Sequence, residues 1–135
     1  MSDELSIALV GIGGYGNNFV TALLDAPAQQ KVRFAGTVDP SPASCRRLAD
    51  LKSRNIAHFS SLEAFYEKHR ADLVIISSPL QYHADQTCLA LGRGSHVLCE
   101  KPLCVSIEQA RQIRDARDRT GKIVGIGYQW SFADA

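Results

Sequence analysis

The chain has 135 residues, of which 45% are hydrophobic and 21% are charged, and its formal net charge is +1. A chain of this length forms one domain and buries about two-thirds of its unfolded surface. The balanced charge excludes a broad electrostatic surface for nucleic acid or anionic lipid, and no apolar run approaches the about 20 residues of a membrane span. The acidic first four residues lack the apolar core of a secretion signal, so we expect a cytoplasmic protein.

The first predicted element is an apolar strand at 6–11, which runs directly into a glycine-rich turn at 11–16. Gly11, Gly13 and Gly16 form the Gly-x-Gly-x-x-Gly pattern of dinucleotide-binding turns. In such a turn the first glycine permits the sharp bend, the second lets the backbone approach a pyrophosphate, and the third lets the next helix pack closely. The helix predicted at 15–25 would direct its N-terminal amides at the phosphates. Tyr15 either lies over the pyrophosphate or packs on this helix.

The second predicted strand, at 32–38, ends in Asp39. This carboxylate follows the glycine turn by about 20 residues, the spacing of the acidic residue that holds the adenosine ribose. A negative charge there repels the 2′-phosphate of NADP, so the residues favour NAD. Arg46 and Arg47 favour NADP instead, because a basic side chain could neutralise that phosphate. We expect both to be solvated, however, on a helix at 41–53. Ser41 would cap this helix in front of Pro42.

The remaining elements continue the alternation of strands and helices. Ser106 and Gln109 form a capping-box pattern at the start of the last helix. Near-continuous apolar strands suit a parallel sheet that is covered on both faces. We therefore predict an α/β fold, a doubly wound parallel six-stranded sheet of the Rossmann type with strand order 3-2-1-4-5-6, in a single three-layer domain. The further strands are predicted at 55–59, 73–77, 96–99 and 123–127, and the further helices at 61–70, 81–92 and 106–120.

The four cysteines do not form a metal-binding or disulfide pattern. Cys45, Cys88, Cys99 and Cys104 include no C-x-x-C pair, and no histidine pair has zinc spacing. Cys99 lies in an apolar strand, where a buried free thiol is expected. The sequence therefore predicts no metal site.

Two stretches in the second half resemble known family motifs. Residues 72–83 resemble a strand that ends in a Thr-Pro-Asn-x-x-His loop, and residues 94–103 resemble the G-x-H-V-x-x-E-K-P stretch. On these motifs, and on the similarity of 124–130 to the segment that leads into a second domain, the chain resembles the Gfo/Idh/MocA family. Three positions depart from the common pattern: Leu80 stands where Asn is frequent, Ser78 replaces Thr, and Ser131 stands where many relatives carry Arg.

The resemblance implies an NAD- or NADP-dependent oxidoreductase that transfers a hydride to or from a sugar, inositol or related polyol. It implies that residues 1–127 are the NAD(P)-binding Rossmann domain and that 128–135 begin the connection to a C-terminal substrate domain absent from this chain. That second domain would supply most substrate contacts, the usual catalytic histidine and the dimer contact, so we expect this chain alone to be inactive. The alternative is a non-catalytic NAD(P)-binding module with a sensor or regulatory role. A Rossmann enzyme that binds S-adenosylmethionine fits the Glu-Lys-Pro stretch less well.

Lys101 is the residue that we expect to act in the reaction. It follows the strand at 96–99, at the sheet edge where ligands bind in open α/β folds, and its ammonium group can stabilise negative charge on a substrate oxygen. Glu100 would orient Lys101 or bind the cofactor, and Pro102 suggests a cis peptide as a hypothesis. His83 is either a capping or packing residue or a contact of cofactor or substrate. The predicted cofactor-binding residues are Gly11, Ile12, Gly13, Gly14, Tyr15, Gly16, Asp39, Ser77, Ser78, Pro79, His83, Glu100 and Lys101.

Overall fold

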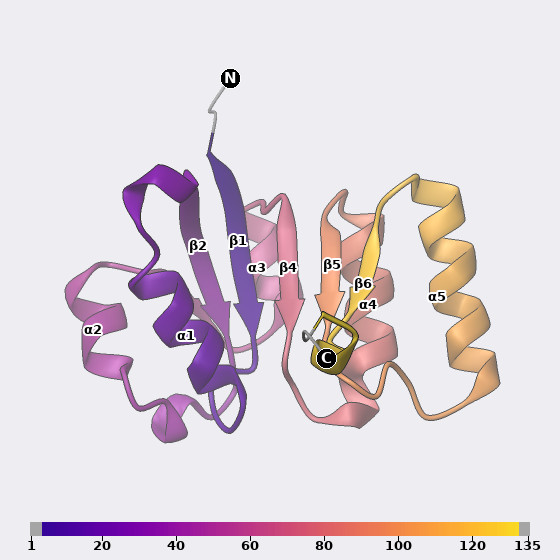
Figure 1. The fold of residues 1–135 in the computed structure, drawn as a ribbon, viewed down its shortest axis with the longest axis horizontal. Helices are drawn as coiled ribbons and strands as arrows, with labels where there is room; N and C mark the ends of the chain where they lie inside the picture. Colours follow the sequence, from indigo (N-terminus) through magenta and orange to yellow (C-terminus); the bar gives the residue numbers. More distant parts are fainter. Residues whose placement is uncertain (1–3, 133–135) are drawn as a thin grey trace.

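A six-stranded sheet forms the centre of the molecule in the computed structural model, which describes residues 4–132. Every neighbouring pair of strands is parallel, and the strand order is β3-β2-β1-β4-β5-β6, which confirms the predicted order (Figure 1). β1 and β4 lie side by side in the middle of the sheet, with β2 and β3 outward of β1 and with β5 and β6 outward of β4. The strands are β1 (Leu5–Val10), β2 (Val32–Val38), β3 (His58–Phe59), β4 (Leu73–Ile76), β5 (His96–Cys99) and β6 (Val124–Ile126).

Helices cover both faces of this sheet (Figure 1). Ala8 and Val10 of β1 pack with residues of α3, α4 and α5, whereas Ile7 and Leu9 pack with residues of α1 and α2. Because successive side chains of a strand point to opposite faces, β1 is apolar and buried on both faces from Ile7 to Val10. The helices are α1 (Gly16–Leu24), α2 (Leu48–Ser53), α3 (Leu62–Lys68), α4 (His83–Gly92) and α5 (Ile107–Thr120), with 3-10 turns η1 (Ala28–Gln30), η2 (Pro42–Ser44), η3 (Leu80–Tyr82) and η4 (Gln129–Phe132).

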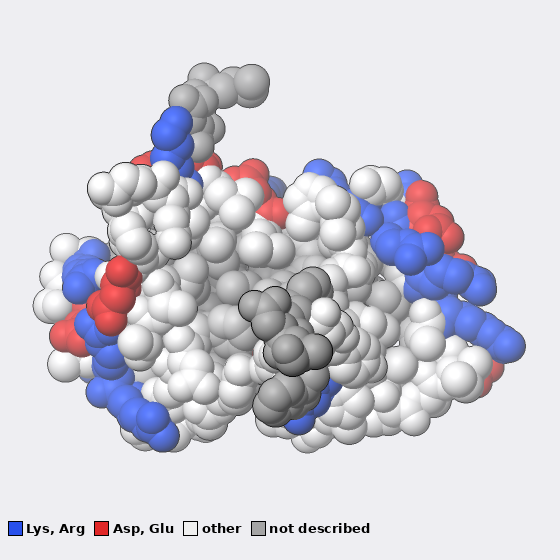
Figure 2. Space-filling view, in the orientation of Figure 1, with Lys and Arg blue, Asp and Glu red and all other residues white. Residues whose placement is uncertain are grey.

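No helix among residues 4–132 combines the length and the apolar character needed to cross a bilayer. Charged side chains gather over the helices at the two ends of the view in Figure 2, and the middle of this face carries few of them. The arginines of α5 are partly neutralised on the helix itself, because Arg114 and Arg117 pair with the aspartates that follow them at 2.8 and 2.7 Å.

The last helix begins with the predicted serine cap. Ser106 Oγ accepts a hydrogen bond from the Gln109 amide at 3.2 Å, and Ser61 caps α3 in the same way through the Ala64 amide. The Gln109 side chain accepts from the Val105 amide at 3.0 Å, one residue before the position that a capping box would use.

The predicted continuous helix at 41–53 is wrong. The segment forms η2, then an extended Cys45, and only then α2, and Ser41 makes no side-chain capping bond. A distant side chain takes the backbone groups that a helix would pair: Asn17 Oδ1 accepts from the Arg46 amide at 2.7 Å, and its Nδ2 donates to the Ser44 carbonyl at 3.3 Å. Cys45 is thereby free to turn inward, where it is buried between α1 and α2.

A buried polar chain joins α3 to the loop before β5. Ser95 Oγ donates to the Ala71 carbonyl at 2.6 Å, and the Tyr66 hydroxyl lies 2.6 Å from Ser95 Oγ. Ser95 has one hydroxyl proton and gives it to Ala71, so Tyr66 is the donor to Ser95. Burial raises the pKa of the Tyr66 phenol above its ordinary value, and the hydrogen bond to Ser95 partly offsets that shift.

We expect Ser95→Ala to reduce the free energy of unfolding by about 2–3 kcal/mol and Tyr66→Phe by about 1 kcal/mol. The serine change leaves both the buried Tyr66 hydroxyl and the Ala71 carbonyl without their partner, whereas the tyrosine change leaves the bond from Ser95 to Ala71 intact. Urea unfolding of the two variants measures the difference. The exposed Ser53→Ala, which also removes one bond to a carbonyl, is the control and should change stability by less than about 0.5 kcal/mol. Equal losses from the two buried variants would contradict the assigned donor directions.

Candidate functional site

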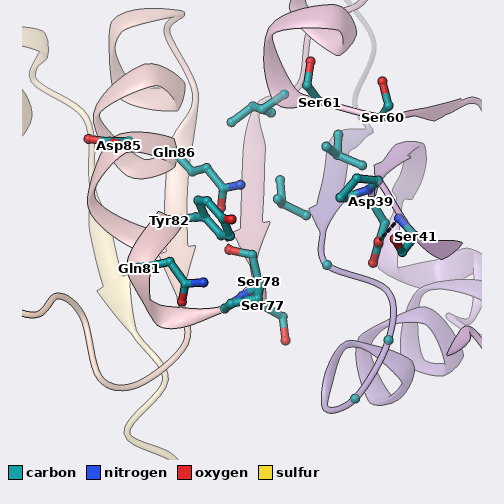
Figure 3. A pocket seen from close by; sticks show the side chains of 18 of the residues that line it. Asp39, Ser41, Ser60, Ser61, Ser77, Ser78, Gln81, Tyr82, Asp85 and Gln86 are labelled. Atoms are coloured by element: carbon teal, nitrogen blue, oxygen red, sulfur yellow. Dashed lines mark hydrogen bonds between the residues drawn. The ribbon is translucent and has the colours of Figure 1, made fainter.

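A cavity of about 950 Å³ lies at the carboxyl ends of β1, β2 and β4. Figure 3 shows Ser78, Tyr82 and Gln86 reaching into it from one side, and Asp39 and Ser41 facing them from the other. Its volume falls within the range of about 300–1,000 Å³ that holds small ligands and cofactors. The cavity is lined by Val10, Gly11, Gly13, Gly14, Tyr15, Val38, Asp39, Pro40, Ser41, Ser44, Ser60, Ser61, Leu62, Glu63, Ser77, Ser78, Pro79, Gln81, Tyr82, Asp85 and Gln86.

The glycine turn is packed against its surroundings at each of its three spaced positions. A Cβ atom at Gly11 would lie 2.5 Å from the Ser77 carbonyl oxygen, and one at Gly16 would lie 2.0 Å from the Gly11 carbonyl oxygen. These contacts fit the expected roles of the first and third glycines, which are the turn and the close approach of α1. At Gly13 a Cβ would lie 2.2 Å from Ser44 Oγ. The neighbour of the second glycine within this chain is therefore a hydroxyl of η2, a contact that the motif did not reveal.

Asp39 connects the glycine turn to the end of β2. Its Oδ2 accepts from the Ile12 amide at 3.0 Å, and its Oδ1 accepts from the Ser41 amide at 2.7 Å (Figure 3). Each carboxylate oxygen has a second lone pair, so the side chain can still accept from a ligand hydroxyl. Asp39 therefore shapes the turn as well as facing the cavity.

The two arginines after Asp39 lie outside the cavity. Arg47 pairs with Asp25 at 2.8 Å and with Asp50 at 2.6 Å, and these bonds raise its pKa. Arg46 is exposed and does not line the cavity. Among the described residues that line the cavity, none is lysine or arginine, whereas Asp39, Glu63 and Asp85 contribute carboxylates.

A second hollow of about 380 Å³ adjoins the first and shares Tyr15, Ser77 and Ser78 with it. Lys101 is exposed at this hollow, and Glu100 is 8% exposed and lines it as well. Glu100 Oε2 accepts from the Lys101 amide at 3.2 Å, and its carboxylate lies against Gly127, where a Cβ would come within 2.8 Å of both oxygens. The Lys101–Pro102 peptide is cis, which confirms the hypothesis drawn from the sequence.

His83 and Tyr15 both make internal contacts beside this hollow. His83 is 2% exposed, with Nδ1 2.8 Å from the Pro102 carbonyl oxygen and Nε2 2.8 Å from that of Ser78. This geometry favours the packing alternative for His83. Tyr15 packs edge-on against Phe19 at 5.7 Å between ring centroids, and its hydroxyl accepts from Gln129 Nε2 at 2.5 Å. Because the Tyr15 ring also lines both hollows, packing on α1 and contact with a ligand are compatible.

Residues 5–128 match the family described as an oxidoreductase family with an NAD-binding Rossmann fold. The chain belongs to the Gfo/Idh/MocA family. A dehydrogenase of 1-carboxy-3-chloro-3,4-dihydroxycyclohexa-1,5-diene from Comamonas testosteroni is 29% identical over 91% of this chain and 31% of its own length. The D-glucoside 3-dehydrogenase of Escherichia coli (strain K12) is 26% identical over 98% of this chain and 37% of its own length. The crystal structure of GenD2 from gentamicin A biosynthesis, in complex with NAD, superposes with a TM-score of 0.77, at 26% identity over 94% of this chain and 35% of that one.

This Gfo/Idh/MocA chain therefore spans about a third of the length of these relatives. The prediction that 128–135 begin a connection to a second domain remains a prediction. Residues 133–135 lie outside the described residues, as do the side chains of Trp130 and Phe132, on which the aromatic character of that segment depends.

Sequence reasoning missed several residues of this Gfo/Idh/MocA chain that line the two hollows or support them. Gln129 lines the smaller hollow and bonds Tyr15 across 114 positions, while Ser44 and Tyr82 line the larger cavity. Asn17 is buried at the start of α1 and positions Ser44 by donating a hydrogen bond from its side-chain amide to the Ser44 carbonyl. The one signal of this contact in the sequence was the polar residue Asn17, which directly follows the glycine turn at a position that α1 buries. Cys99, next to Glu100, is a buried free thiol as predicted, and burial raises its pKa to about 11.

Proposed function

We propose that this chain is the NAD-binding domain of an oxidoreductase that moves a hydride between the cofactor and a sugar, an inositol or a related polyol. The observation that supports it best is the adjoining pair of hollows, one lined by the glycine turn and Asp39 and the other by Lys101. The names of relatives support the substrate class, since they include a D-glucoside dehydrogenase and an inositol 2-dehydrogenase.

The residues fit a dinucleotide on structural grounds. Gly13 and Gly14 of the turn line the cavity without a Cβ atom, the cavity has the volume of a cofactor site, and Asp39 retains lone pairs for the ribose hydroxyls. Bound NAD would supply or accept the hydride at C4 of its nicotinamide. Of the predicted contacts, Gly13 and Gly14 line the larger cavity and would hold the pyrophosphate, Ser77, Ser78 and Pro79 would line the path to the nicotinamide, and Glu100 and Lys101 would face it. Ile12 is fully buried and gives its amide to Asp39, and the Gly16 amide donates to the Gly13 carbonyl, so these two residues line neither hollow and would shape the turn instead.

Lys101 is the proposed catalytic residue. Its ammonium group would donate to the substrate oxygen, which becomes more negative when the hydroxyl gives up its proton in the oxidation direction or when the hydride reaches the carbonyl carbon in the reduction direction. In the oxidation direction the carbon loses the hydride, the oxygen loses a proton to a base, and a carbonyl forms. A base and the wall that excludes water would come from a second domain, as would the surface of any homo-oligomer. The protein is proposed to be cytoplasmic, with a small-molecule substrate and neither nucleic acid nor membrane as partner.

We expect the 135-residue chain to bind NAD weakly and to reduce none of it when sugars or inositols are added. Binding is expected because the described residues would supply the contacts on the adenosine and pyrophosphate side of NAD. Turnover is expected to fail because no described residue closes the hollow that contains Lys101. Calorimetric titration with NAD and an absorbance assay for NADH measure the two outcomes. Absence of NAD binding would contradict the proposed function, and robust turnover would contradict the assignment of catalysis to two domains.

The catalytic test requires a longer protein that contains this chain and a second domain. In a longer protein that turns over a polyol, Lys101→Ala should lower kcat by about 100-fold or more, since lost donors to a developing negative charge have effects of that size. The binding of NAD should change by less than about threefold. A longer protein that binds NAD without reacting with any polyol would favour the sensor or regulatory alternative.

A further inference from the structure

Gln86 of α4 presents a fixed carboxamide to the larger cavity. Its side chain is half-buried, and its Oε1 accepts a hydrogen bond from the Ser78 hydroxyl at 2.5 Å. Because Ser78 follows β4 directly, this bond holds the amide against the edge of the sheet. Among residues 4–132 no acceptor takes either proton of Gln86 Nε2. Figure 3 shows this nitrogen on the side of Gln86 that faces Asp39, so its two protons are available to a ligand in the cavity.

The ring of Tyr82 lines the cavity beside this carboxamide. Tyr82 ends η3 and precedes α4 with helical backbone angles, so its side chain and that of Gln86, four positions later, leave the same side of the helix. The residue is 51% exposed, and none of the ring contacts among the described residues includes it. A free ring face next to a fixed amide suits a flat heteroaromatic group, which stacks on the ring and bonds the amide through its edge.

This wall lies in the part of the cavity that the rest of a dinucleotide would leave open. The glycine turn would take the pyrophosphate, Asp39 the adenosine ribose, and the smaller hollow the nicotinamide. The base attached to that ribose is the one flat group that remains. The lining residues that remain for it are those of η3 and α4 on one side and those of the loop before α3 on the other.

We propose that Gln86 determines which base the bound dinucleotide carries, and that it selects adenine. Adenine has an acceptor, N7, beside its 6-amino donor, and a glutamine amide pairs with both, Nε2 donating to N7 and Oε1 accepting from the amino group. Oε1 has a lone pair for this bond besides the one that Ser78 uses. In hypoxanthine an oxygen replaces the amino group, so that two acceptors would face an amide with one donor and one acceptor. The inference rests on the proposed function for the presence of a dinucleotide.

Titration of the 135-residue chain with NAD and with nicotinamide hypoxanthine dinucleotide, which differs from NAD only in the base, tests the proposal. We expect NAD to bind about tenfold or more tightly than the hypoxanthine compound, as a paired glutamine and adenine would give. Gln86→Met keeps the length of the side chain but loses both polar groups, and it should bring the two affinities to within about threefold. Equal affinities in the parent chain would overturn the proposal, as would a Gln86→Met chain that keeps the preference. A parent chain that binds neither compound would instead contradict the proposed function itself.

Gln81→Met is the matched control. Gln81 lines the same cavity from η3, but it is exposed and its amide has no hydrogen-bond partner among the described residues, so nothing fixes it against a base. The Gln81→Met chain should keep the preference of the parent for NAD, and its loss there would overturn the assignment to Gln86.

Tyr82→Leu separates stacking from recognition of the base edge. An aromatic face stacks on either base, so this change should weaken the binding of both dinucleotides by about fivefold and leave their ratio unchanged. A Tyr82→Leu chain that loses the preference for NAD would show that the ring, and not the Gln86 amide, selects the base, and would also overturn the proposal.

Discussion

Replacing Gly11 by alanine should reduce the free energy of unfolding by about 3–5 kcal/mol, whereas Gly14→Ala should reduce it by only about 1–2 kcal/mol. Both glycines have a positive φ, +83° at Gly11 and +48° at Gly14, and an alanine in that region loses about 1–2 kcal/mol. The positions differ in space: a Cβ at Gly11 would meet the Ser77 carbonyl at 2.5 Å, and a Cβ at Gly14 would meet nothing within 4 Å.

The difference between the two variants measures the packing of β1 against β4. The atoms that a Cβ at Gly11 would meet belong to the backbone that follows β4, which cannot rotate away as a side chain can, and overpacking typically removes about 1–3 kcal/mol. Gly11 is also held by its amide, which donates to the Val38 carbonyl at 2.8 Å. Urea unfolding of both variants gives the two free energies.

Gly92→Ala is the control for the substitution itself. Gly92 is the last residue of α4, has no positive φ, and has open space where a Cβ would be. Alanine there should leave stability unchanged or raise it by about 0.4–1 kcal/mol, because it restricts the unfolded chain. If Gly11→Ala and Gly14→Ala were equally destabilising, the close contact between the turn and the end of β4 would be wrong.

Most of the fold could be predicted from the sequence, because local patterns of apolar residues determine the strands and the helices. The apolar run of β1 buries Ile7 and Leu9 on one face and Ala8 and Val10 on the other, which is possible only for a strand covered by two layers of helices. Alternation of such strands with helices leaves the doubly wound order as the natural arrangement. Lys101 and Glu100 were found by a motif that places them at a strand end, and the structure brings both to one hollow with Tyr15.

What the sequence could not reveal depends on side chains that meet from distant positions. The break between η2 and α2 is caused by Asn17, which takes backbone groups of residues that follow it by almost 30 positions. No helix propensity within 41–53 encodes that competition. In the same way, the two alternatives for His83 could be separated only by its carbonyl partners, which are contributed by backbone and leave no trace in residue type.

This chain should bind NAD about 100-fold or more tightly than NADP. A 2′-phosphate on a ribose held by Asp39 would bring like charges to about 4 Å, where the repulsion is roughly 4 kcal/mol per unit charge at an effective dielectric constant of about 20. Half of that energy already corresponds to more than tenfold in affinity. No lysine or arginine among the described lining residues would neutralise the phosphate, and Arg47 is engaged with Asp25 and Asp50.

Asp39→Asn should bring the affinities for NAD and NADP to within about tenfold of each other, chiefly by removing the repulsion. The amide keeps one oxygen as an acceptor for the Ile12 or Ser41 amide but loses the other, so some loss of NAD affinity is expected as well.

Asp85→Asn is the matched control, because Asp85 lines the same cavity from α4 and points away from Asp39 in Figure 3. The ratio of NAD to NADP affinity of the Asp85→Asn variant should stay within about threefold of that of the parent chain, since a distant exposed charge is screened by solvent and salt. Titrations of all three chains with both cofactors measure the ratio; a parent chain that prefers NADP, or an Asp85→Asn ratio that falls as far as that of Asp39→Asn, would show that Asp39 does not determine the choice of cofactor.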